Sequence, residues 1–230
     1  YKRQMYQLGG NPLYLSASDM QIGRGEPIQD TARVLSRYID GIMIRTFDQA
    51  EVENLAEYGN IPIINGLTDL SHPCQVLADL MTIREYKGKL DGLKMCYIGD
   101  GNNMANSLIV GGLKTGMSVS VACPENYHPA ATTLAFAKKY DCFELTDDPI
   151  KAAKDADVIF TDVWASMGQE GEAEIRKKAF KGFQINDEVM AVAKPDAMVQ
   201  HCLPAHREEE ITAKVFEAHA DEIFDEAENR

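Results

Sequence analysis

The sequence predicts an α/β protein of two domains, each built on a parallel sheet flanked by helices, with a Rossmann-like second domain. Apolar runs of strand length alternate with segments whose apolar residues recur at helical spacing, an order typical of parallel sheets. A polar stretch with two glycines, residues 87–92, interrupts the alternation, which then restarts. We therefore expect domains over 1–88 and 92–230, with a ligand crevice at the carboxyl ends of the strands.

The first domain is expected to open with the end of a helix, because Gly9 and Gly10 follow a short helical pattern and glycine commonly ends a helix. Pro73 suits the first turn of a later helix, since its fixed φ is helical and its missing N–H needs no partner there. The predicted strands are 13–15, 41–46 and 61–67, and the predicted helices are 2–8, 28–39, 49–58 and 73–86.

The second domain continues the same alternation. Its predicted strands are 94–98, 118–123, 142–145, 158–163 and 198–203, and its predicted helices are 103–114, 129–140, 149–155, 186–193 and 211–218. The segment 169–182 is polar and charged. We interpret it as a mobile lid, with an ordinary surface loop as the alternative.

Charge and cysteine content restrict the class of partner. The formal net charge of −13 argues against nucleic acid, whose binding needs clustered Lys and Arg, but leaves room for a local basic pocket. The five cysteines are odd in number and widely spaced, which indicates reduced thiols, a cytoplasmic location and no zinc framework. No apolar run approaches the ~18 residues of a membrane span, and the N-terminal residues lack the apolar core of a signal peptide.

His72 and Gln75 lie where the strand 61–67 gives way to the helix that begins at Pro73. Free backbone N–H groups and the positive end of the helix dipole make such a junction a natural anion site. A histidine that only caps the helix is the alternative, and it would be preferred for a lone His-Pro pair. The residues 72–75, taken with the later motifs, favour a binding site.

Arg45 ends the predicted strand 41–46, which we expect to be buried and to deliver this guanidinium to the sheet edge. Arginine suits phosphate because its planar donors bind two oxygens and stay charged. A solvated strand end explains Arg45 equally well on its own.

The stretch 99–103 reads Gly-Asp-Gly-Asn-Asn between a strand and a helix. A dinucleotide fingerprint would need glycine at position 104, where this chain has Met104, although Glu125 offers a ribose-binding acid. The preferred interpretation is a tight turn that presents Asn103 to a zwitterionic amino acid, because an amide side chain both donates and accepts hydrogen bonds.

Two later strand ends carry polar residues. Asp162 stands where a carboxylate can hold an ammonium group, and a Ser-Met-Gly turn follows at 166–168. His201 and Cys202 end another strand, and alternation places them on opposite faces, so a direct Cys–His catalytic pair is not expected. Alone, Cys202 would be a buried core thiol, but the abrupt stop at Pro204 and the charged run beyond it favour a site.

Together these stretches resemble the aspartate/ornithine carbamoyltransferase family, and most closely its ornithine branch. The Ser-Met-Gly loop after Asp162 and the His-Cys-Leu-Pro strand end are specific to that branch. The matching stretches follow in order along nearly the whole chain, at 5–10, 30–35, 45–46, 72–75, 99–104, 162–168, 201–204 and 225–230.

The resemblance implies transfer of a carbamoyl group from carbamoyl phosphate to the δ-amine of L-ornithine, giving L-citrulline and phosphate. The residues that it implies for carbamoyl phosphate are Arg45, His72, Gln75, Cys202, Leu203 and Arg230. Of these, Arg45, His72, Cys202 and Arg230 are implied as catalytic. The residues that it implies for ornithine are Asn103, Asp162, Ser166 and Met167.

The physical chemistry agrees with this reaction. A neutral amine attacks the carbonyl carbon through a tetrahedral oxyanion, which Arg45 and His72 would stabilise as preorganised donors. The δ-amine titrates near ~10 when unperturbed, and a closed, dry site favours its neutral form. No metal or organic cofactor is needed. The expected partners are the two small substrates and further copies of the chain in a homotrimer.

Departures from the family pattern leave alternatives open. The family carries a Ser-Thr-Arg-Thr-Arg phosphate loop upstream of the first helix and a helix beyond Arg230, and this sequence contains neither. We therefore expect impaired activity with a persisting fold. The alternatives are a non-catalytic or engineered ligand-binding scaffold and a carbamoyltransferase for another amine such as putrescine, which lacks the head group that the Ser-Met-Gly loop reads. A nicotinamide-dependent dehydrogenase is a distant third.

Overall fold

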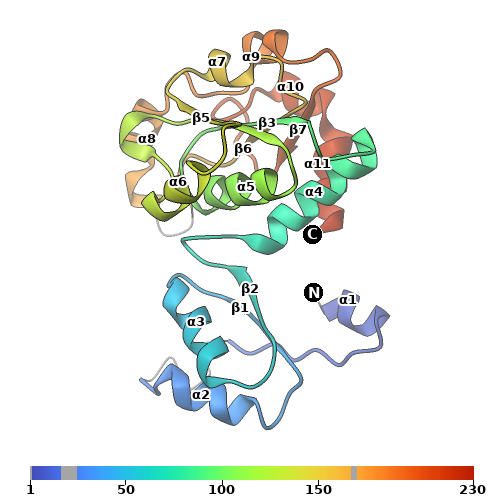
Figure 1. Ribbon diagram of the computed structural model, residues 1–230, viewed down its shortest axis with the longest axis vertical. Coiled ribbons are helices and arrows are strands. Elements are labelled where there is room, and N and C mark those ends of the chain that lie inside the picture. Colours follow the sequence, from blue (N-terminus) through green and yellow to red (C-terminus); the bar gives the residue numbers. More distant parts are fainter. Residues whose placement is uncertain (1, 17–24, 167–169) are drawn as a thin grey trace. The chain divides into compact units, whose positions relative to one another are not determined.

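The computed structural model describes residues 2–16, 25–166 and 170–230. Its contacts divide the chain into two compact units, Tyr1–Ile64 and Asn65–Arg230, which Figure 1 shows in blue to cyan and in blue-green to red respectively. This division places the helix after Pro73 with the second unit, where it packs on two other helices. The sequence-based boundary near residue 90 stays a prediction.

The first unit has a small core between two helices. Its helices are α1 (Lys2–Gln7), α2 (Ile28–Leu35) and α3 (Gln49–Tyr58), and strand β1 (Ile42–Arg45) pairs with β2 (Ile63–Leu67), which crosses into the second unit. Helix α3 begins where the Asp48 carboxylate accepts a hydrogen bond from the N–H of Ala50, 2.9 Å away. The buried apolar residues described in this unit are Ala32 of α2 and Val52 and Leu55 of α3.

Three expectations for this unit are wrong in detail. Residues 13–15 form no strand, and Leu13 and Tyr14 are each 76% exposed, so strand-forming side chains alone do not make a strand without a neighbour to pair with. Helix α2 ends at Leu35 instead of residue 39, in a turn where the Ser36 hydroxyl donates to the Ala32 carbonyl. Strand β1 is not buried, because its residues alternate between half-buried and exposed in a two-stranded sheet.

The second unit is built on a five-stranded parallel sheet of order β5-β4-β3-β6-β7. Its strands are β3 (Lys94–Ile98), β4 (Ser118–Ala122), β5 (Phe143–Thr146), β6 (Val158–Thr161) and β7 (Met198–His201). Its helices are α4 (Pro73–Lys87), α5 (Asn103–Lys114), α6 (Ala131–Ala137), α7 (Pro149–Ala153), α8 (Ala173–Ala179), α9 (Asp187–Val192), α10 (Ala213–Ala218) and α11 (Ala220–Asn229), with short 3₁₀ turns at Glu125–Tyr127 and Glu170–Glu172.

Both faces of this sheet are covered by apolar packing. Met95 and Tyr97 of β3 belong to one core cluster with α4, α5 and α6, and the intervening Cys96 and Ile98 belong to a second with α7, α9 and α10 (Figure 1). Successive strand residues point to opposite faces, so a sheet covered on both sides requires the nearly continuous apolar strands that the sequence shows. Among the described residues, no helix combines the length and apolarity required to cross a bilayer.

The last third of the chain holds two helices that the sequence analysis missed. The segment interpreted as a lid contains α8, whose one buried residue is the charged Arg176, so apolar spacing does not reveal it. Ile223 and Phe224 lie within α11, on which only Ile223 and Glu226 are buried. In both helices an ionisable side chain takes a core position that a periodicity argument assigns to an apolar one.

Gly101 is required by a close approach of backbone. A Cβ at this position would lie 2.3 Å from the carbonyl carbon of His128 and from the nitrogen of Pro129, and the Gly101 N–H donates to the Tyr127 carbonyl. Met104 is buried, so this turn is built for packing where a dinucleotide fingerprint would have its third glycine.

We predict that Gly101→Ala destabilises the protein by about 1–3 kcal/mol, because backbone atoms must move to admit the methyl group. Thermal unfolding measures the loss. Gly171→Ala is the matched control, since a Cβ there meets nothing within 4 Å, and it should change stability by less than about 0.5 kcal/mol. Equal melting temperatures for the two variants would contradict the argument.

Candidate active site

Polar side chains gather where three neighbouring parallel strands end. Asn102 follows β3, Asp162 follows β6 and Cys202 follows β7, and these strands are adjacent in the order β3-β6-β7. After β3 the chain first adds β4 and β5 on one side of the sheet and then β6 and β7 on the other side. The strand order therefore reverses between β3 and β6. Ligands of open α/β sheets bind outside the carboxyl ends of the strands at such a point.

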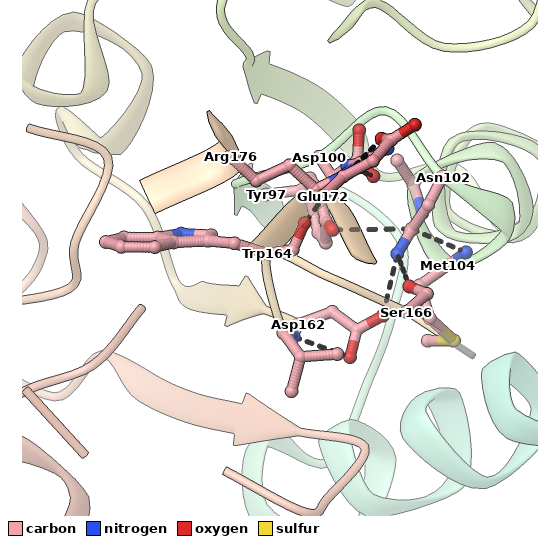
Figure 2. Close-up of polar contacts among 11 residues, drawn as sticks. Tyr97, Asp100, Asn102, Met104, Asp162, Trp164, Ser166, Glu172 and Arg176 are labelled. Atoms are coloured by element: carbon pink, nitrogen blue, oxygen red, sulfur yellow. Dashed lines mark hydrogen bonds and ion pairs between the residues drawn. The ribbon is translucent and has the colours of Figure 1, made fainter. Parts of the chain in front are cut away.

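Asn102 links the start of α5 to the Asp162 carboxylate. Its Oδ1 accepts hydrogen bonds from the N–H groups of Met104 (2.9 Å) and Ala105 (3.2 Å), which caps the helix. Its Nδ2 donates to Asp162 Oδ2 (2.8 Å) and Ser166 Oγ (3.2 Å), as Figure 2 shows. The sequence analysis missed this residue, although an Asn directly before a helix is a capping signal.

Asn103, the residue named from the sequence, takes a different position. Its Nδ2 donates to the Thr68 carbonyl (2.8 Å), and its own carbonyl accepts from Ser107 Oγ (2.7 Å). Ser107 Oγ in turn accepts the N–H of His72 (2.8 Å). Asn103 therefore joins α5 to the residues before α4.

Asp162 is buried and well supplied with donors. Its Oδ1 accepts from the N–H of Val163 (2.8 Å) and from Cys202 Sγ (3.0 Å), while its Oδ2 accepts from Asn102. Burial raises the pKa of the Cys202 thiol well above its ordinary range, and the Asp162 charge raises it further. Cys202 is thus a neutral thiol that donates to a carboxylate.

His72 caps α4 as the cautious interpretation expected, and the cap also fixes its tautomer. Its Nδ1 accepts from the N–H of Gln75 (3.4 Å), so a neutral ring carries its proton on Nε2. The side chain is buried. The cap and the binding role are therefore compatible, because the ring presents Nε2–H as a donor.

Arg230 connects Gln75 to the end of β7. Its guanidinium donates to Gln75 Oε1 (2.8 Å) and to the Cys202 carbonyl (2.9 Å). Leu203 follows with φ +53° and a cis peptide bond to Pro204. Its N–H donates to Nδ1 of His201 (2.9 Å).

The second unit thus brings together nearly all of the predicted site residues that lie in it: His72, Gln75, Asn103, Asp162, Ser166, Cys202, Leu203 and Arg230. Met167 lies outside the described residues. Arg45 belongs to the first unit, where it ends β1 with an exposed side chain. Its substrate-binding role stays a prediction.

Two family models cover almost the whole chain. The carbamoyl-phosphate-binding domain of aspartate/ornithine carbamoyltransferase matches residues 2–85, and the aspartate/ornithine-binding domain matches residues 91–230. This chain belongs to the aspartate/ornithine carbamoyltransferase family. The resemblance and the α/β fold predicted from the sequence are thereby confirmed.

Individual members of the family are similar over the same length. The ornithine carbamoyltransferase of Thermococcus kodakarensis is 57% identical over 98% of this chain and 73% of its own, and that of Geobacter metallireducens is 54% identical over 98% and 75%. The Pyrococcus furiosus structure superposes with a TM-score of 0.92 at 54% identity, covering 99% of this chain and 74% of its own. The anabolic enzyme from Campylobacter jejuni gives 0.93 at 42% identity, covering 99% and 77%.

A buried arginine holds the segment after Asp162 in this family member. Arg176 of α8 donates to Asp100 Oδ2 (2.7 Å) and to the Trp164 carbonyl (3.0 Å), and its guanidinium lies 5.0 Å from the centre of the Tyr127 ring (Figure 2). Burial raises the pKa of Asp100, and Arg176 opposes that shift. Arg176 therefore links α8 to Trp164 and to the turn after β3.

His201 has its ring nitrogens engaged beside this site. Its Nδ1 accepts from Leu203, and its Nε2 lies 3.0 Å from Glu210 Oε1. Ligand atoms of His201, Cys202 and Asp162 lie within 4.8 Å of one another. A metal ion there would have to displace these hydrogen bonds and deprotonate the thiol, so the arrangement suits hydrogen bonding better than ligation.

We predict that Arg176→Met destabilises the protein by about 3–5 kcal/mol at neutral pH, because it leaves the buried Asp100 charge unpaired. The loss should shrink as pH falls, because without Arg176 the pKa of Asp100 rises further and the carboxyl can take up a proton. Chemical denaturation at several pH values measures this. Lys178→Met on the exposed side of α8 should have little effect. A loss independent of pH would contradict the ion-pair explanation.

We also predict that iodoacetamide alkylates Cys142 before Cys202 at pH 8, because Cys142 is exposed while the Cys202 thiol is held neutral. Mass spectrometry of peptides from a time course measures the order, and both residues should react in urea. Equal rates in the folded protein would contradict a neutral Cys202 thiol that is held in its hydrogen bond to Asp162.

Proposed function

We propose that this chain transfers the carbamoyl group of carbamoyl phosphate to the δ-amine of L-ornithine, releasing L-citrulline and phosphate. The observation that carries the proposal is the position of Cys202. Its carbonyl accepts from Arg230, which also donates to Gln75, and its thiol donates to Asp162, which accepts from Asn102. Cys202 thus joins two sets of side chains. The first set, Arg230 and Gln75, carries a positive charge and an amide, and the second set, Asp162 and Asn102, carries a carboxylate and an amide.

These two groups match the two substrates. Arg230 and the Nε2–H of His72 offer donors for a carbamoyl oxygen that gains negative charge, and the Gln75 amide oxygen offers an acceptor for the carbamoyl NH₂ group. Asp162, with Asn102, Asn103 and Ser166, offers acceptors and amides for the α-amino and carboxylate groups of ornithine. In this proposal Cys202 and the Leu203 carbonyl lie beside the reacting δ-amine and carbamoyl group, Met167 completes the ornithine side, and Arg45 binds the phosphate and the developing oxyanion.

The names of the two matching family domains support a division of labour, with residues 1–88 binding carbamoyl phosphate and 92–230 binding ornithine. The relatives named anabolic support the biosynthetic direction, toward arginine. The proposal includes a homotrimer and a cytoplasmic location. A non-catalytic scaffold and a putrescine carbamoyltransferase remain the competing functions, and one assay separates them.

The test is citrulline formation from carbamoyl phosphate and L-ornithine, with putrescine and L-aspartate as parallel acceptors. Of the three acceptors, we predict that only ornithine gives product. Arg45→Ala should lower kcat by about 100-fold or more, since one oxyanion donor contributes about 10²–10³ in kcat. Arg37→Ala, an exposed arginine of the same unit, is the matched control and should retain activity.

Other outcomes assign the competing functions. Product from putrescine with none from ornithine would support the other amine. No product from any acceptor, with the protein folded, would support the scaffold.

A further inference from the structure

Two acidic side chains lie completely buried behind Gln75. Asp79 is on α4, one helical turn beyond Gln75, and Glu226 is on α11, which packs against α4. Both residues are 0% exposed. Buried carboxyls cost free energy unless they are paired or hydrogen-bonded, so their contacts need an explanation.

The two acids hold the Gln75 amide in one orientation. Gln75 Nε2 donates to Asp79 Oδ1 (2.8 Å) and to Glu226 Oε1 (2.8 Å), while its Oε1 accepts from Arg230 (2.8 Å). If the amide were turned over, its NH₂ group would face a guanidinium and its oxygen would face two acceptor oxygens. Only the observed orientation satisfies all three neighbours.

The hydrogen bonds also indicate where a proton lies. Both oxygens of Glu226 accept from N–H groups, Oε1 from Gln75 and Oε2 from the backbone of His201 (2.9 Å), so Glu226 is the carboxylate. Asp79 Oδ2 is buried and has no N–H or O–H partner in the described parts of the chain, and the two carboxyls converge on the same Gln75 nitrogen. Two buried carboxylates this close repel each other, which favours uptake of one proton, and Asp79 Oδ2 is the oxygen with room for it.

We propose that Asp79 and Glu226 share one proton, carried on Asp79 Oδ2, and that the pair acts as a positioning device that orients Gln75 toward the carbamoyl group. Its catalytic consequence rests on the function proposed above, in which Gln75 binds that group. The pair itself touches no substrate.

The surrounding charges favour the singly protonated pair. Arg230 faces it from α11, Asp162 from the end of β6 and Cys202, a neutral thiol, from the end of β7. One proton leaves the pair with a single negative charge against Arg230, whereas none leaves two buried charges beside Asp162. Burial is the largest cause that raises the pKa of both acids, that of Asp79 to about 7, and Arg230 opposes the shift in each.

Two substitutions that remove the same charge should therefore differ in effect. In Asp79→Asn the amide NH₂ stands where the proton stood and donates to Glu226, while Oδ1 still accepts from Gln75. In Glu226→Gln a single acceptor oxygen replaces two, so Gln75 and the His201 N–H cannot both be satisfied. Glu228→Gln, an exposed position on the same helix, is the control.

The kinetic experiment is citrulline formation by the parent chain and these three variants. We expect Glu226→Gln to lower kcat/KM for carbamoyl phosphate by about 10- to 100-fold, the size of a hydrogen bond to a charged group, with a smaller change in KM for ornithine. Asp79→Asn should stay within about threefold at pH 6, and Glu228→Gln should match the parent. An Asp79→Asn protein that folds but loses as much as Glu226→Gln would overturn the placement of the proton.

A second readout does not depend on activity. The pKa of Asp79 is raised on folding, so the native state binds the extra proton and the parent loses stability as pH rises from about 4 to about 7. Asp79→Asn removes this dependence, so the melting temperature of the variant minus that of the parent should rise over that window and level off above it. A constant difference would overturn the shared proton. If the parent makes no citrulline, the proposed function fails, and this readout still decides the pair.

Discussion

The side-by-side ending of β3, β6 and β7 is the constraint on which the candidate site depends. The carboxyl ends of parallel strands lie at the same edge of a sheet. Asn102, Asp162 and Cys202 therefore meet there, although they lie about 40 to 100 positions apart in sequence. Apolar packing on both faces holds this edge in place. The polar groups at this edge can then be arranged for binding, because the sheet behind them needs no contribution from them.

Around that edge, hydrogen bonds compensate for the burial of charged and polar groups. Asp162 accepts from three donors, Arg176 pairs with Asp100, and Glu226 accepts from two N–H groups. Each such group would destabilise the fold if its partners were removed. The same bonds fix the orientation of the Asn102 and Gln75 amides and of the His72 ring.

Much of this could be predicted from local patterns, and the failures have a common origin. Strand β3, helix α3 and helix α5 were predicted with the bounds observed. The strand is a short, nearly continuous apolar run, and each of the two helices combines an apolar pattern with a capping residue, Asp48 or Asn102. Helices α8 and α11 escaped because Arg176 and Glu226 occupy core positions. The sequence analysis named Asn103 where the structure has Asn102, because a local pattern does not show which of two adjacent amide side chains points toward the end of β6.

The α/β class, the family and the strand ends at which polar residues gather can be predicted from the sequence, since they depend on spacing along the chain and on short motifs. Which of those residues touch depends on the folded structure. The contacts of Gln75 with Glu226 and Arg230 join positions about 150 apart, and no local pattern encodes such a pairing. Whether a buried acid is a carboxylate or carries a proton depends on donors supplied by other helices and strands, and only folding brings those donors together.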